Sequence, residues 1–317
     1  MTMTFNEGAR MDSGRVTVGG SHRGGGGRGG KAALGGGLGG LVVLVLALLL
    51  GGNPGSLLGG LTGASDSAQL GTGSITELEN CQTGADANRD VNCRVAFTTA
   101  SLDSVWGEEL QKQTGVRYVQ PGVMLFSGAV NTGCGNATSD VGPFYCPADS
   151  TAYFDTSFFQ LLVDQFGSSA GPLAQEYVVA HEIGHHIQNQ LGDIGRAQAD
   201  PKGAESGAVR TELQADCYAG VWAHYADTKP APGGGAPFLK TLSENDIRDA
   251  LSAASSVGDD RIQQASSGRV NPEGWTHGSS SQRQKWFATG YKTGQVSACN
   301  TYAARDLDSP AGLNAQR

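Results

Sequence analysis

The stretch from residue 172 to residue 191 most constrains the fold, because its apolar residues recur at the spacing of a helix. Four of them lie four positions apart: Val179, Ile183, Ile187 and Leu191. On a helix they form one apolar stripe. Gly171 and Pro172 suit the start of a helix, and Gly192 suits its end. The stretch therefore predicts a long helix with one face against a core.

The same stretch contains the pentapeptide HEIGH at 181–185, which is an HExxH motif. His181 and His185 are four residues apart, so both imidazoles project from one face of a helix. Two neutral imidazoles held in this way can bind one Zn²⁺. Glu182 lies beside them and could accept a proton from a water molecule that the metal activates. The alternative is an exposed helix with two solvated histidines, and further ligands decide between the two.

A second helical pattern, at 205–227, carries Glu212 and Asp216 four residues apart. A hydrolytic zinc site takes three protein ligands and leaves a position for water, so Glu212 is the expected third ligand. Asp216 could accept a hydrogen bond from the distal nitrogen of a ligand imidazole and so fix its tautomer. The alternative is a surface carboxylate pair. The apolar context and the preceding HExxH motif favour the metal site.

Hydrolysis of a peptide bond also needs a donor for the oxyanion besides the metal. His277 is the first candidate for this catalytic role, with Arg283 and Tyr218 as reserves. The alternative for His277 is a structural hydrogen bond in a turn rich in Gly and Ser. His186 is expected to be structural or exposed, and His224 is expected on a helix surface.

The N-terminal part differs in composition from the rest. Residues 1–31 are rich in Gly and Arg and are expected to form a disordered, basic cytoplasmic tail. Residues 32–52 contain no charge and can just span a bilayer, which predicts a transmembrane signal-anchor. The preceding basic residues place the N-terminus in the cytoplasm and the main domain outside. The alternative is a signal peptide cleaved near Ala64. Residues 53–74 are expected to be a linker.

The remaining chain is expected to form one α+β domain at 75–303, mainly helical, with a small sheet and a zincin-like arrangement, followed by a disordered tail at 304–317. A strand is expected at 123–126 and an extended segment over 145–154. In a zinc peptidase such a strand can lie at the cleft edge, where a peptide adds to it. An ordinary sheet strand is the alternative. The acidic net charge of −8 argues against nucleic acid as a partner.

Six cysteines lie beyond residue 80: Cys81, Cys93, Cys134, Cys146, Cys217 and Cys299. An oxidising compartment outside the membrane favours disulfides, and six cysteines allow fifteen pairings. Proximity in sequence favours Cys81–Cys93 and Cys134–Cys146, which leaves Cys217–Cys299. The alternative is reduced, buried thiols in a cytosolic protein.

Three motifs together resemble the putative neutral zinc metallopeptidase family of bacteria: HEIGHH at 181–186, ELQAD at 212–216 and THGSSSQR at 276–283. Proteins of that family usually carry an N-terminal membrane segment and one extracytoplasmic domain. The order of HExxH and ExxxD is also similar to that of the gluzincins. The resemblance implies His181, His185 and Glu212 as zinc ligands. It also implies Glu182 as the catalytic base and Asp216 as the carboxylate beside a ligand.

The sequence therefore predicts a membrane-anchored zinc metallopeptidase that acts on a peptide or protein substrate outside the membrane. The competing prediction is a non-enzymatic, membrane-anchored module with a structural zinc site. Such a module predicts a closed site with four ligands. Glu182 favours the enzyme, because a structural site has no use for a carboxylate at that position.

Overall fold

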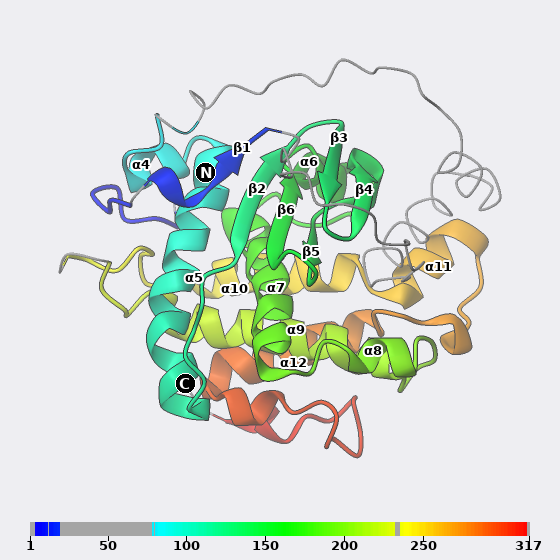
Figure 1. Cartoon of the computed structure of the whole chain (residues 1–317). Helices are drawn as coiled ribbons and strands as arrows, with labels where there is room; N and C mark the ends of the chain where they lie inside the picture. Colours follow the sequence, from blue (N-terminus) through cyan, green and yellow to red (C-terminus); the bar gives the residue numbers. More distant parts are fainter. Residues whose placement is uncertain (1–3, 12, 20–77, 79, 232–234, 316–317) are drawn as a thin grey trace, which may run out of the picture.

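The computed structural model describes residues 4–11, 13–19, 78, 80–231 and 235–315 of the chain (Figure 1). It shows a mainly helical α+β fold with small sheets, as the sequence predicted. The α-helices are α4 (Gly84–Ala87), α5 (Val91–Thr114), α6 (Phe158–Asp164), α7 (Pro172–Leu191), α8 (Arg196–Ala199), α9 (Gly207–Ala226), α10 (Glu244–Ser256), α11 (Asp259–Ser267) and α12 (Ser280–Thr293). The strands are β1 (Thr17–Val18), β2 (Gly122–Phe126), β3 (Ala129–Thr132), β4 (Gly135–Thr138), β5 (Phe144–Cys146) and β6 (Thr151–Asp155).

The larger sheet has the strand order β1-β2-β6-β5. Strands β1, β2 and β6 are parallel, whereas β5 runs antiparallel to β6 and forms one edge. Side chains alternate between the two faces. Val123 and Leu125 join the core beneath the sheet, and Met124 and Phe126 join a smaller cluster with the β3–β4 hairpin. The hairpin thus covers the face opposite the helices.

The helices that carry the predicted motifs pack closely because small residues lie at their contacts. A Cβ atom added to Gly184 of α7 would lie 2.9 Å from the carbonyl oxygen of Ala215 in α9. A Cβ atom on Gly290 of α12 would lie 1.9 Å from the carbonyl oxygen of Cys217. These approaches leave no room for a larger residue. They place α7 against α9, and α9 against α12 (Figure 1).

The expected helix ends around the motifs are present. Gly171 and Pro172 begin α7, and Gly192 ends it with a left-handed backbone at φ 82°. Ser206 caps α9 by accepting a hydrogen bond from the backbone of Val209 at 3.2 Å. Ser243 and Asp246 form the expected capping box at the start of α10.

The three disulfides predicted from sequence proximity are all present. Cys81–Cys93 joins the segment before α4 to α5. Cys134–Cys146 joins the β3–β4 hairpin to β5. Cys217–Cys299 joins α9 to the 3₁₀ turn at Val296–Cys299.

The N-terminal segment differs from the disordered tail that its composition suggested. Within residues 4–18, Phe5 is fully buried and its ring lies edge-on to Phe97, with the centroids 5.7 Å apart. Arg15 binds Asp103 through two hydrogen bonds, of 2.5 and 3.2 Å. Strand β1 then pairs with β2. This segment is therefore part of the folded domain.

The predicted membrane topology is wrong. No helix in the described residues is long and apolar enough to cross a membrane. A single span at 32–52 would put residues 4–18 and the main domain on opposite sides, yet these two parts pack together. The predicted span at 32–52 and linker at 53–74 themselves lie outside the described residues.

The C-terminal segment also differs from the expected disordered tail at 304–317. Leu307 is buried, and its carbonyl oxygen accepts a hydrogen bond from the indole of Trp286 at 3.0 Å. Lys292 donates to the carbonyl oxygen of Leu313 at 2.8 Å. The described residues up to 315 therefore pack against α12. Their order depends on these long-range contacts, which composition does not reveal.

Candidate metal centre

Helices α7 and α9 bring together the three predicted metal ligands. His181, His185 and Glu212 each offer one ligand atom, and these atoms lie within 4.8 Å of one another. His181 Nε2 is 3.2 Å from Glu212 Oε2, and His185 Nε2 is 3.5 Å from Glu212 Oε1. All three residues are buried. Their atoms are close enough to share one ion.

The opposite nitrogen of each imidazole has its own acceptor. His181 Nδ1 is 2.8 Å from Asp216 Oδ1, and His185 Nδ1 is 2.7 Å from Gln188 Oε1. Each Nδ1 therefore donates to its acceptor, which leaves each Nε2, on the side of Glu212, as the nitrogen that can bind a metal. Two imidazole nitrogens and a carboxylate that face one another can share a proton or a metal cation. Two imidazole nitrogens and a carboxylate oxygen suit Zn²⁺.

The side chain of Gln188 is held so that its oxygen faces His185. Its amide nitrogen donates to the carbonyl oxygen of Thr211 at 2.7 Å and to Oε1 of Gln214 at 2.9 Å. The amide orientation is therefore determined by two acceptors on α9. Gln188 was not predicted from the sequence, although its place three residues after His185 put it within one helical turn.

The charges at the centre favour a positive ion. Burial raises the pKa of Glu212, but His185 and His181 outweigh burial, so that pKa lies well below its usual range. Burial lowers the pKa of His181, but Asp216 and Glu212 outweigh burial and raise it to about 10. The carboxylates thus attract one positive charge to this point, which a proton or a metal ion can supply.

Asp216 is itself held by Arg283. The guanidinium donates from Nε to Oδ2 at 2.8 Å and from Nη2 to Oδ1 at 2.9 Å, and the Tyr177 hydroxyl also donates to Oδ1. Burial raises the pKa of Asp216, but Arg283 and His181 outweigh it and bring the pKa to about 2. The carboxylate beside His181 is therefore ionised and fixed. Arg283 was predicted as a reserve oxyanion donor, but its geometry makes it a support for Asp216.

His277 lies in the same cleft and is oriented by Asp259. Its Nδ1 is 2.9 Å from Thr276 Oγ1 and 3.3 Å from Asp259 Oδ1. The other oxygen of Asp259 accepts the backbone N–H groups of Thr276, His277 and Gly278 at 2.7, 2.7 and 3.0 Å. Burial lowers the pKa of His277, but Asp259 and Glu212 outweigh burial and raise it. Asp259 was not predicted from the sequence.

Glu182 lines the cleft beside the two histidines. Burial raises its pKa, against the opposing effect of His181 and His185. A carboxylate whose pKa is raised toward neutrality is a better proton acceptor at physiological pH. The position of Glu182 thus suits the general base that the sequence predicted.

The cleft has a volume of about 110 Å³ and an edge formed by β5. That edge is lined by Gly142, Pro143, Phe144 and Tyr145, and apolar side chains of α6, α7 and α10 form a wall of the cleft. Tyr218 is not among the lining residues. It packs edge-on against Trp106 in the core, with centroids 5.8 Å apart, so its prediction as a reserve oxyanion donor is wrong. His224 bonds the carbonyl oxygen of Tyr291 at 2.7 Å and is structural.

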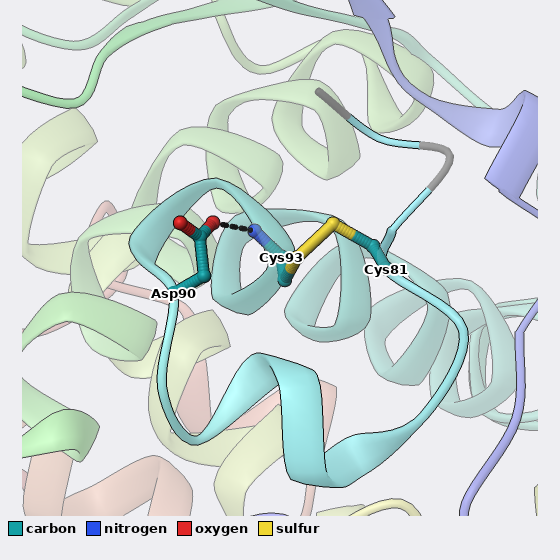
Figure 2. A group of neighbouring side chains, drawn as sticks. All are labelled: Cys81, Asp90 and Cys93. Carbon is teal, nitrogen blue, oxygen red and sulfur yellow. Dashed lines mark hydrogen bonds between the residues drawn. A yellow bond between two sulfur atoms is a disulfide. The ribbon is translucent and has the colours of Figure 1, made fainter. Parts of the chain in front are cut away.

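A second group of potential ligands does not form a metal site. Cys81, Asp90 and Cys93 lie together (Figure 2). The two cysteines form a disulfide, so neither offers a thiolate. Asp90 instead caps α5 by accepting the backbone N–H of Cys93 at 2.9 Å (Figure 2).

An HExxH helix crossed by a second helix with a glutamate and an aspartate defines the class of zinc peptidase-like proteins. The family described as "Putative neutral zinc metallopeptidase" matches residues 4–302, so the chain belongs to that family.

Relatives cover most of the chain. An uncharacterized protein of Mycobacterium tuberculosis is 62% identical over 231 residues, which cover 73% of this chain and 77% of that protein. The uncharacterized protein YpfJ of Escherichia coli is 39% identical over 267 residues, covering 83% and 86% of the two chains. No solved structure matches this chain.

Proposed function

We propose that this protein is a zinc-dependent peptidase that hydrolyses peptide bonds in peptide or protein substrates. The observation that carries the proposal is the convergence of His181, His185 and Glu212, whose ligand atoms lie within 4.8 Å of one another, with Glu182 in the same cleft. A zinc ion bound there would polarise a substrate carbonyl and lower the pKa of a water molecule.

Two residues of the chain have separate roles in the proposed reaction. Glu182 accepts a proton from the attacking water and passes it to the leaving amine. His277 donates a hydrogen bond to the oxyanion from Nε2, while its Nδ1 stays with Asp259. The raised pKa of His277 favours the imidazolium, which can donate from both nitrogens at once.

Strand β5 offers a binding edge for an extended peptide. Among the described strands, β5 pairs with β6 alone, on one of its sides. Residues 142–145, which lead into this strand and form its first part, line the cleft. A peptide can add to such an edge through backbone hydrogen bonds. The scissile carbonyl would then lie against the candidate metal centre.

A structural zinc site is the competing function, and it requires a fourth protein ligand. Within the described residues only three side chains meet at this centre. His277, the expected fourth ligand, lines the cleft but does not belong to the group whose ligand atoms lie within 4.8 Å of one another. The three-ligand arrangement, open to the cleft, supports hydrolysis instead.

Two variants test the proposal against unfolded protein substrates. Glu182→Gln should keep zinc but lower kcat about 100- to 10,000-fold, because the general base is lost. Glu212→Ala should lower bound zinc well below one ion per chain. Unchanged cleavage by Glu182→Gln would disprove its role as base, and full zinc content in Glu212→Ala would remove it from the ligands.

A further inference from the structure

The second histidine of the pair His185-His186 faces away from the metal ligands and toward β5. His186 is only 3% exposed. Its Nδ1 lies 2.9 Å from the Tyr145 hydroxyl, and its Nε2 lies 2.7 Å from the carbonyl oxygen of Val119. The rings of His186 and Tyr145 also meet edge-on, with centroids 5.5 Å apart. His186 therefore connects α7 to the strand at the cleft edge.

The tautomer of His186 sets the direction of these hydrogen bonds. The carbonyl of Val119 can only accept, so Nε2 of His186 donates to it and Nδ1 accepts from Tyr145. The Tyr145 oxygen in turn accepts from the side-chain amide of Asn189 at 2.9 Å. The amide of Gln190, 2.8 Å from Nε2, donates to the same Val119 carbonyl at 2.6 Å.

The strand that this network reaches lies beside the candidate metal centre. Phe144 and Tyr145 both belong to β5 and line the cleft. His186 directly follows the candidate ligand His185 on α7, and Asn189 lies one turn further along. Strand β5 is also joined to β6 and, through Cys134–Cys146, to the hairpin. The Tyr145 hydroxyl joins the strand to the helix that carries the ligands.

We propose that His186 and Tyr145 are positioning residues that hold β5 at a fixed place relative to the metal ligands, so that an extended peptide paired with β5 presents its scissile carbonyl to the centre. This inference rests on the proposed peptidase function. Without the tether, β5 must be ordered when the peptide pairs with it, and this cost weakens the binding of the peptide. Loss of the tether should therefore affect long peptides more than substrates too short to pair with β5.

The test uses Tyr145→Phe and His186→Phe, which keep an aromatic ring at each position and remove the hydrogen bond between the two side chains. Tyr153→Phe is a matched control, because the Tyr153 hydroxyl on β6 bonds Asp149 at 2.7 Å and does not line the cleft. For a ten-residue peptide, we expect each test variant to raise KM about tenfold with a smaller change in kcat. A blocked dipeptide, zinc content and the control should change less than twofold.

Equal losses on the long peptide and the blocked dipeptide, or no loss on either, would overturn the inference. A binding measurement separates it from the proposed function. Zinc-free parent and variants are titrated with the same fluorescent ten-residue peptide, and the tether predicts about tenfold weaker binding in Tyr145→Phe. A parent that binds the peptide but never cleaves it with zinc refutes the peptidase alone. A parent that neither binds nor cleaves it refutes both.

Discussion

Arg283 binds both carboxylate oxygens of Asp216, at 2.8 and 2.9 Å, although the two residues are 67 positions apart in the sequence. Both side chains are almost completely buried. Asp216 in turn accepts from His181 Nδ1. The orientation of one candidate ligand thus depends on an ion pair between α9 and α12, two helices that pack through Gly220 and Gly290.

Asp216→Asn should lower zinc affinity about 10- to 100-fold, the usual effect of removing a partner of a ligand histidine. The amide keeps the shape of the carboxylate but loses the charge that His181 and Arg283 face. Zinc affinity is measured by competition with a chelator. Asp306→Asn, at an exposed site, should leave it unchanged. Equal affinity in the two variants would show that Asp216 does not support the metal.

Asp259→Asn should lower kcat and shift the alkaline limb of the pH–rate profile to lower pH. The pKa of His277 is raised because Asp259 outweighs the effect of burial, so the imidazolium persists to higher pH and is lost as pH rises through that pKa. Removing the carboxylate removes this effect. The neighbouring Asp260 binds Ser280 instead, so Asp260→Asn is the matched control. A profile that does not move would separate Asp259 from the titration of His277.

The features predicted correctly from sequence are those with local signals. Helix α7 has its apolar stripe, its Pro172 start and its Gly192 end within one stretch, so the two histidines had to share a face. Glu212 and Asp216 were also four residues apart on a capped helix. Helical spacing was enough to group these residues, because the geometry of a helix is fixed.

The missed features depend on contacts between distant residues. Helix α11 is polar, and Ile262 is its main buried apolar residue. Its first residue, Asp259, accepts hydrogen bonds from backbone N–H groups 17 to 19 positions away in the sequence. The β3–β4 hairpin is turn-rich, and it is ordered by packing Val130 and Ala137 against the sheet. Residues 4–18 looked like a flexible tail because composition cannot show a partner such as Glu176, which lies 172 positions from Thr4.

Glu176 makes stability depend on pH. Its side chain is fully buried on α7, Thr4 donates to one carboxylate oxygen, and the other has no hydrogen-bond partner in the described residues. Burial raises the pKa from 4.5 to about 7, although Thr4 and Arg94 act to lower it. The folded state therefore holds this proton more tightly than the unfolded state. Stability should fall as pH rises from about 4.5 to about 7.

Above pH 7 the raised pKa of Glu176 lowers the free energy of unfolding by about 3 kcal/mol. Glu176→Gln should remove that cost, so the variant should gain stability relative to the parent at pH 8 but not at pH 5. Denaturant unfolding at both pH values measures the difference. Glu273→Gln, at an exposed position, is the control and should follow the parent. A parallel pH dependence in parent and Glu176→Gln would exclude Glu176 as its source.

The apolar wall of the cleft should select substrates. The wall consists of half-buried aromatic and aliphatic side chains from three helices and their connections: Phe158, Phe166, Val178 and Val257. Val178 lies one turn before His181 and Glu182 on α7, so the wall flanks the candidate metal centre. The Phe158 ring lies close to Gly142, where an added Cβ atom would be 3.2 Å away, which places the ring beside the start of β5. A bulky apolar side chain next to the scissile bond fits this wall.

Phe158→Ala should therefore lower kcat/KM about tenfold for peptides with Phe or Leu beside the scissile bond, because burying such a side chain contributes about 1.5–3 kcal/mol. Peptides with Gly or Ala at that place should be cleaved almost as before, since they do not reach the wall. Peptide libraries compared by mass spectrometry give both values in one experiment. Val270→Ala removes an exposed apolar side chain and should change neither value. If Phe158→Ala slows all peptides equally, Phe158 supports the fold of the cleft and does not select the substrate.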